Sequence, residues 1–108
     1  MTQAEILAAC KLACRVASTA LDNEFNALIA AAYLDLENSG VETVDGTPYT
    51  PENSDQLVVT AVKTFVKLHL GDLLDNSEAV RLESSYWSQV AKLRNRRLSS
   101  SDIPGDES

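Results

Sequence analysis

The sequence predicts an all-α fold: a compact four-helix domain with one long loop between the second and third helices and a disordered C-terminal tail. In four separate segments, apolar residues recur every three or four positions, the period of an amphipathic helix. Glycines and prolines fall between these segments. The chain has 108 residues, 44% of them hydrophobic, as expected for one globular domain. We therefore expect a helical domain over residues 1–97 and a flexible acidic tail over 98–108.

The first helix is expected over about residues 3–16. Thr2 stands before it and Glu5 follows three residues later, the spacing of a capping box in which each side chain bonds the other residue's backbone N–H. Cys10 and Cys14 lie one turn apart, a spacing that favours two small buried residues over a disulfide or a metal site. The apolar positions of this helix are Leu7, Cys10, Cys14 and Ala17.

The second helix is expected from about Thr19 to Ser39. Asp22 and Glu24 stand in its first turns, where negative charge complements the helix dipole. Gly40 is placed to end the helix in a left-handed conformation. Its apolar face is formed by Leu21, Phe25, Leu28, Ala32 and Leu36.

Residues 41–53, with the sequence VETVDGTPYTPEN, are expected to form the loop. Asp45-Gly46 indicates a tight turn, and the prolines at 48 and 51 forbid a helix. Val41 and Val44 give a weak hairpin signal. Because loops often carry contact surfaces, Tyr49 is a candidate contact residue.

The third helix is expected over about residues 54–70, with Asn53 as its cap, Gln56 three residues on, and Gly71 at its end. Four polar residues share a narrow arc and apolar residues fill the rest, so this is the predicted central helix. The polar arc consists of Thr60, Lys63, Thr64 and Lys67.

His69, the single histidine, falls in the apolar arc of the third helix. A catalytic or ligating imidazole needs an orienting partner or further ligands. No Asp, Glu, Cys or second His stands at ligand spacing on the same helix, and Asp72 lies beyond its expected end. We interpret His69 as a structural, hydrogen-bonded residue.

The fourth helix is expected from Asn76 or Ser77 to about Arg97, with an apolar stripe of Ala79, Leu82, Tyr86, Val90 and Leu93. Its basic last turns complement the helix dipole, or contact an acidic partner surface or passing DNA. Trp87 lies beside the stripe. The complete candidate interaction surface comprises Tyr49, Trp87, Lys92, Arg94, Arg96 and Arg97.

The composition argues against several function classes. Nine basic and sixteen acidic residues give a net charge of -7, which disfavours binding along nucleic acid. The four glycines are isolated, so no phosphate-binding loop is present. A magnesium-dependent hydrolase would need paired carboxylates one turn apart, which neither Asp35 with Glu37 nor Asp72 with Asp75 provides. We expect a protein that is not an enzyme and has no catalytic residue, cofactor or metal.

The start of the chain has no basic region typical of a signal peptide, and no apolar stretch reaches the ~18 residues that span a membrane. These features predict a protein made in the cytosol, without a membrane partner.

The order of features in the second half resembles a known family. An apolar helix LVVTAVKTFVKLHLGD is followed by an acidic turn LLDNSEA and by RLESSYWSQVAKLRNRR. This order is similar to that of the small head-tail connector, or adaptor, proteins of tailed bacteriophages and prophages, which are also described as DNA-packaging proteins. The segment LDNEFNALIAAAYLDLENSGV stands where these proteins have an acidic-start helix ending in Gly-Val. The matching positions are 62–65, Gly71, 76–79, Tyr86 and Leu93.

The resemblance implies a homo-oligomeric, dodecameric ring beneath the portal protein, joining the DNA-filled head to the head-closure or tail connector protein. DNA would pass through the ring without sequence-specific binding. The protein would lie at the head-tail junction of the virion, and in the host cytoplasm during assembly. The alternative function is a small helical regulatory protein that binds one protein partner through its basic C-terminal helix.

Overall fold

The computed structural model describes residues 2–70 and 76–102, with side chains described for 2–70 and 77–95. Within these ranges the chain forms four α-helices and no strand, which confirms the predicted all-α class. Gly71 and the turn up to Asp75 lie outside the described residues, as does the tail from residue 103.

Helix α1 (Gln3–Ala13) begins with the predicted capping box. The Thr2 backbone N–H donates to Glu5 Oε1 at 2.7 Å, and the Glu5 N–H donates to Thr2 Oγ1 at 3.1 Å. The helix ends earlier than predicted because Arg15 adopts a left-handed φ of 59°. The Val16 N–H then bonds the Lys11 carbonyl at 2.9 Å and closes the last turn.

Helix α2 (Asp22–Asn38) starts later than the predicted Thr19 and stops as predicted at Gly40, which has a φ of 87°. The Val41 N–H bonds the Leu36 carbonyl at 2.9 Å, and both of these side chains are buried. This is the hydrophobic contact that commonly accompanies a left-handed helix end. Lys11 Nζ lies 2.7 Å from Asp22 Oδ1, an ion pair that ties α1 to the start of α2.

The connection from α2 to α3 contains a turn and a short 3-10 helix. Thr43 and Thr47 are joined by a backbone bond of 2.9 Å across the turn at Gly46, so the predicted hairpin is reduced to a turn. The 3-10 helix η1 (Pro51–Asn53) begins at a proline. Proline fits that first position, since its missing N–H would be unpaired there in any case.

Helix α3 (Gln56–His69) is capped by Asp55, whose side chain accepts from the Val58 N–H at 3.1 Å. The prediction of Asn53 as the cap is wrong, because the Asn53 side chain instead accepts from the Thr50 N–H at 2.8 Å. As predicted, α3 is the central helix and packs against each of the other three. Its buried residues are Val58, Val59, Ala61, Val62, Phe65 and Val66.

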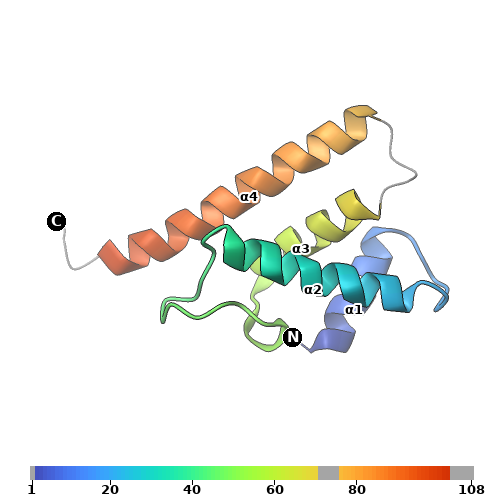
Figure 1. Cartoon of the computed structure of the whole chain (residues 1–108), viewed down its shortest axis with the longest axis horizontal. Helices are drawn as coiled ribbons and strands as arrows, with labels where there is room; N and C mark the ends of the chain where they lie inside the picture. The colour runs from blue at the N-terminus through green and yellow to red at the C-terminus, as the bar shows by residue number, and fades with distance from the viewer. Residues whose placement is uncertain (1, 71–75, 103–108) are drawn as a thin grey trace.

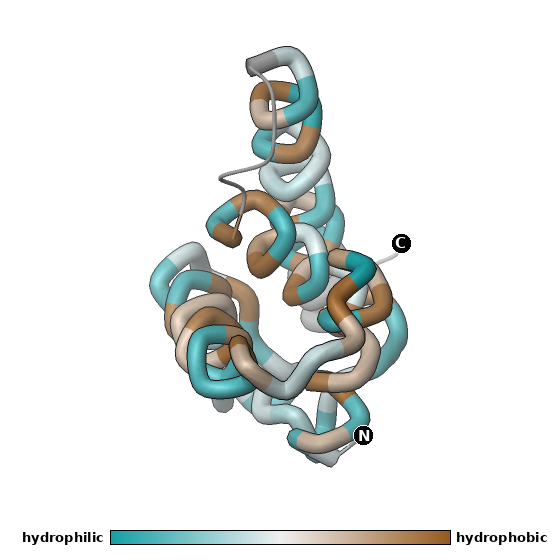
Figure 2. Tube along the Cα trace, turned by 90° about the vertical axis from the view of Figure 1, so that its right-hand side faces the viewer, coloured by the Kyte–Doolittle hydropathy of each residue, from teal (hydrophilic) through white to brown (hydrophobic). Residues whose placement is uncertain are grey.

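Helix α4 (Asn76–Asp102) runs past the predicted end at Arg97, so residues 98–102 of the predicted tail are helical. It lies across α3, and both of its ends extend beyond that helix (Figure 1). Three of its described side chains are buried, Tyr86, Val90 and Leu93, all from the predicted stripe. Turned by 90°, the chain shows α1, α2 and α3 grouped together while the first turns of α4 rise clear of them (Figure 2).

Candidate interaction surface

The six predicted contact residues divide between the loop and α4. Tyr49, in the connection before η1, is half-buried and packs against the core. Trp87, Lys92 and Arg94 are exposed on α4. Arg96 and Arg97 belong to the last turns of α4, beyond the described side chains.

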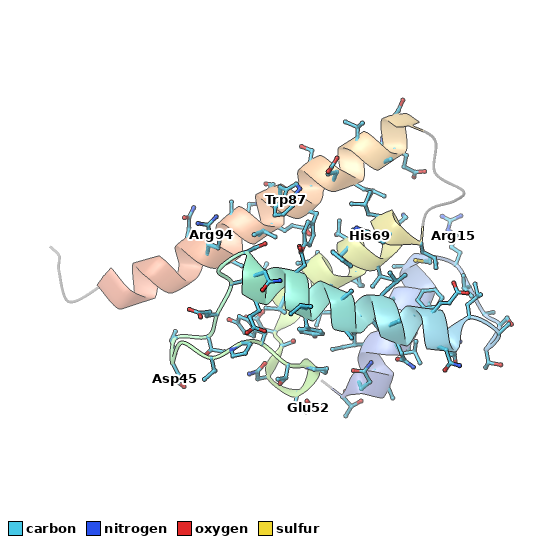
Figure 3. All side chains as sticks on the ribbon, viewed as in Figure 1. Arg15, Asp45, Glu52, His69, Trp87 and Arg94 are labelled. Carbon is cyan, nitrogen blue, oxygen red and sulfur yellow. The ribbon has the colours of Figure 1, made fainter. Side chains whose placement is uncertain are left out.

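Arg94 lies over the end of α2 (Figure 3). A Cβ built on Gly40 would stand 3.5 Å from Arg94 Nε, so the guanidinium covers the left-handed turn that closes α2. A cation near a helix C-terminus is favourable because carbonyl groups there carry partial negative charge. Arg94 therefore has a place within its own chain, which sequence reasoning did not foresee.

Lys92 borders a groove between α3 and α4 of about 200 Å³. Its apolar lining comes from Leu57 and Leu93, and Leu57 is 52% exposed although it belongs to the predicted apolar arc. Gln89 Nε2 donates to Ser85 Oγ at 3.2 Å, whereas Gln89 Oε1 is buried and has no partner among the described residues. The groove thus combines an exposed leucine with an unused hydrogen-bond acceptor.

A second hollow, of about 120 Å³, lies where α2, α3 and α4 meet; we call it the aromatic-acidic depression. The Phe65 and Tyr86 rings lie 5.6 Å apart, and the Trp87 ring meets Tyr86 edge-on at 5.2 Å. Trp87 is 49% exposed, so much of its ring faces solvent. The residues that line the depression are Asp35, Phe65, Leu68, His69, Glu83, Tyr86 and Trp87.

The Tyr86 hydroxyl donates to Asp35 Oδ2 at 2.6 Å and joins α4 to α2 inside the depression. Burial raises the pKa of Tyr86 above its ordinary value, and the hydrogen bond to the Asp35 carboxylate and its negative charge raise it further. The short bond therefore stays intact at neutral pH, and the phenol acts as a donor to a carboxylate. Sequence reasoning missed this pair because 51 positions separate the two residues.

His69 hydrogen-bonds within its own helix, as predicted: Nδ1 lies 2.9 Å from the Phe65 carbonyl oxygen. Its ring stacks on Phe65 with centroids 4.0 Å apart. The side chain is nevertheless exposed near the end of α3 (Figure 3), because no other helix among the described residues covers this part of the apolar arc. The ring forms part of the wall of the depression.

The cysteines differ in burial. Cys10 is fully buried, and that burial raises the pKa of its thiol to about 12. Cys14 is half-buried, and burial raises its pKa as well. Both are free thiols. Among the described residues no three His, Cys, Asp or Glu side chains gather closely enough to hold a metal ion.

Glu83 is the functional candidate that the sequence pattern gave no reason to select. It is exposed on α4, one turn before Trp87, and brings a second carboxylate to the depression beside Asp35.

In the described parts of the chain, no helix is long and apolar enough to cross a membrane. Comparisons with protein-family models, with curated proteins and with solved structures gave no match to this chain.

Proposed function

We propose that this protein is a structural head-tail connector of a tailed bacteriophage, which assembles as a ring of identical subunits beneath the portal. The ring joins the DNA-filled head to the next connector protein and leaves a channel for the genome. The proposal starts from the resemblance of residues 3–97 to small connector proteins. The observation that carries it is that α4 packs within the chain mainly against one helix, α3.

Helix α4 has 27 residues, and its packing within the chain is made mainly against α3. Three of its described side chains are buried, and its first turns stand clear of the other helices (Figure 2). An amphipathic helix of this length usually buries a stripe along its whole length. A neighbouring subunit would cover the part of the stripe that this chain leaves uncovered.

Apolar side chains exposed on α3 and α4 support the same role. Leu57 is 52%, Val80 66% and Trp87 49% exposed. Leu57 borders the groove and Trp87 borders the aromatic-acidic depression, so each hollow has an exposed apolar side chain that a neighbouring subunit would cover. The net charge of -7 suits a subunit whose ring must let DNA slide through, because an acidic wall repels phosphate.

The test is assembly of the purified protein, alone and mixed with a phage portal protein. We expect rings on the portal in negative-stain images and a sedimentation coefficient well above that of a monomer. A chain that stays monomeric in both preparations would contradict the proposal. A complex of one chain with one unrelated protein, lost on reversing Arg96 and Arg97 to Glu, would identify the regulatory alternative.

A further inference from the structure

The aromatic-acidic depression has the chemistry of a receptor for an arginine side chain. Two carboxylates, from Asp35 and Glu83, stand beside the half-exposed ring of Trp87. A guanidinium stacks on an indole face and forms paired hydrogen bonds with a carboxylate. One Asp35 oxygen is engaged by Tyr86 at 2.6 Å, which fixes the carboxylate in place.

The complementary group stands elsewhere on the same chain. Four of the nine Lys and Arg residues fall between positions 92 and 97. Arg94 covers the end of α2 and Lys92 borders the groove against α3. Arg96 and Arg97 are the remaining cations of this cluster, in the last turns of α4.

Arg96 and Arg97 cannot reach the Glu83 and Trp87 side of the depression within one molecule, because these residues all belong to the same continuous helix. At a rise of 1.5 Å per residue, Arg96 and Arg97 lie about 14–21 Å along the axis from Trp87 and Glu83. An arginine side chain does not span that distance back along a rigid helix. A second copy of the chain has no such constraint.

We infer that the aromatic-acidic depression of one subunit binds the basic end of α4, at Arg96 and Arg97, from a neighbouring subunit. The inference rests on the proposed function and names a contact that would join neighbouring subunits of the proposed ring. Donor and receptor are different surfaces of the chain, so the contact is head-to-tail, and such contacts close into rings when the rotation between subunits permits. Trp87 becomes covered when the contact forms.

The experiment uses the full chain, followed by sedimentation velocity and by the emission of Trp87, the single tryptophan. With rising concentration we expect larger species together with a shift of emission to shorter wavelength, because the half-exposed indole becomes buried. Glu83→Arg alone, and Arg96→Glu with Arg97→Glu, should each raise the dissociation constant about tenfold or more. Glu83→Arg combined with Arg96→Glu or with Arg97→Glu should recover association.

Two matched controls reverse charges on the same helices at other faces: Glu37→Lys on α2 and Arg81→Glu on α4, both exposed. They should leave association and emission unchanged. If the wild type forms rings while the reversals at Glu83, Arg96 and Arg97 have no effect, or neither combination recovers association, the inference is wrong and the proposed function stands. A wild type that is monomeric alone and with the portal would overturn both.

Discussion

Helices α3 and α4 are both amphipathic, yet they are used in opposite ways. Helix α3 has 14 residues, of which six are buried, and it touches every other helix. Helix α4 has 27 residues, and three of its described side chains are buried, all of them on one stripe of the helix. The shorter helix organises the core, whereas the longer one exposes most of its described side chains.

This difference teaches that the width of the apolar arc, more than helix length, decides which helix becomes the core. Each fully buried Val, Leu, Ile or Phe contributes about 1.5–3 kcal/mol relative to an exposed one. The six buried residues of α3 therefore stabilise the fold far more per turn than the three of α4. Substitutions that exploit this contrast can test it.

The largest expected effect is at the joint between the two helices. Phe65→Ala should lower the free energy of unfolding by about 3–5 kcal/mol, since the ring is 92% covered in the core and packs against both His69 and Tyr86. Trp87→Ala, at the neighbouring but half-exposed aromatic, should cost about 1 kcal/mol or less. Urea unfolding followed by circular dichroism measures both. Equal losses would mean that α4 is as firmly packed as α3.

The next effect tests the burial of Cys10 on α1, the helix that packs against α3. The pKa of Cys10 is raised by burial to about 12 from its ordinary value of 9.0. The unfolded chain therefore ionises first, so stability present below pH 9 should fall as pH rises toward 12, by at most about 1.4 kcal/mol per pH unit for one proton. Cys10→Ala should have a flatter profile over that range. An unchanged slope in the variant would show that the thiol does not titrate in this way.

A smaller effect is expected at the contact that fixes α4 to α2. Tyr86→Phe removes the 2.6 Å hydrogen bond to Asp35 and leaves the half-buried Asp35 carboxylate with one partner fewer. We expect a loss of about 1–2 kcal/mol, since water can partly replace the hydroxyl at this site. Because the pKa of Tyr86 is raised in the folded chain, the stability that its hydroxyl contributes in the wild type is present below pH ~10 and declines above that value. Val90→Ala, on the same buried stripe, serves as a control that leaves this pH dependence intact.

The four helices could be predicted because their signals are local. Apolar spacing, the Thr2 and Glu5 capping box and the glycine at position 40 each act within a few residues. The wrong cap of α3 shows where local signals compete: Asn53 and Asp55 both suit the position, and Asn53 is already bonded to the Thr50 backbone in η1. Sequence alone does not rank two adequate caps.

The aromatic-acidic depression could not be predicted, because it depends on long-range packing. Asp35 and Tyr86 carry no pattern in common and meet through the crossing of α2 and α4. Leu57 and His69 belong to the apolar arc of α3 and lie at its two ends, where the neighbouring helices leave both side chains exposed. The arc predicts which residues can be buried, and the lengths and angles of the partner helices decide which ones are.

The smallest expected effect asks whether α4 unfolds together with the other three helices. Arg15 holds a left-handed φ of 59° at the end of α1, where glycine has no steric cost. Arg15→Gly should therefore raise the free energy of unfolding by about 0.5–1 kcal/mol, although the freer unfolded chain offsets part of the gain. Circular dichroism reports on all helices, whereas Trp87 fluorescence reports on the packing of α4 at the aromatic-acidic depression. If both transitions move by the same amount, α4 is part of one cooperative unit although it packs mainly against α3. If only the dichroism transition moves, α4 separates first, and its stability in the assembled protein must come from a neighbouring subunit.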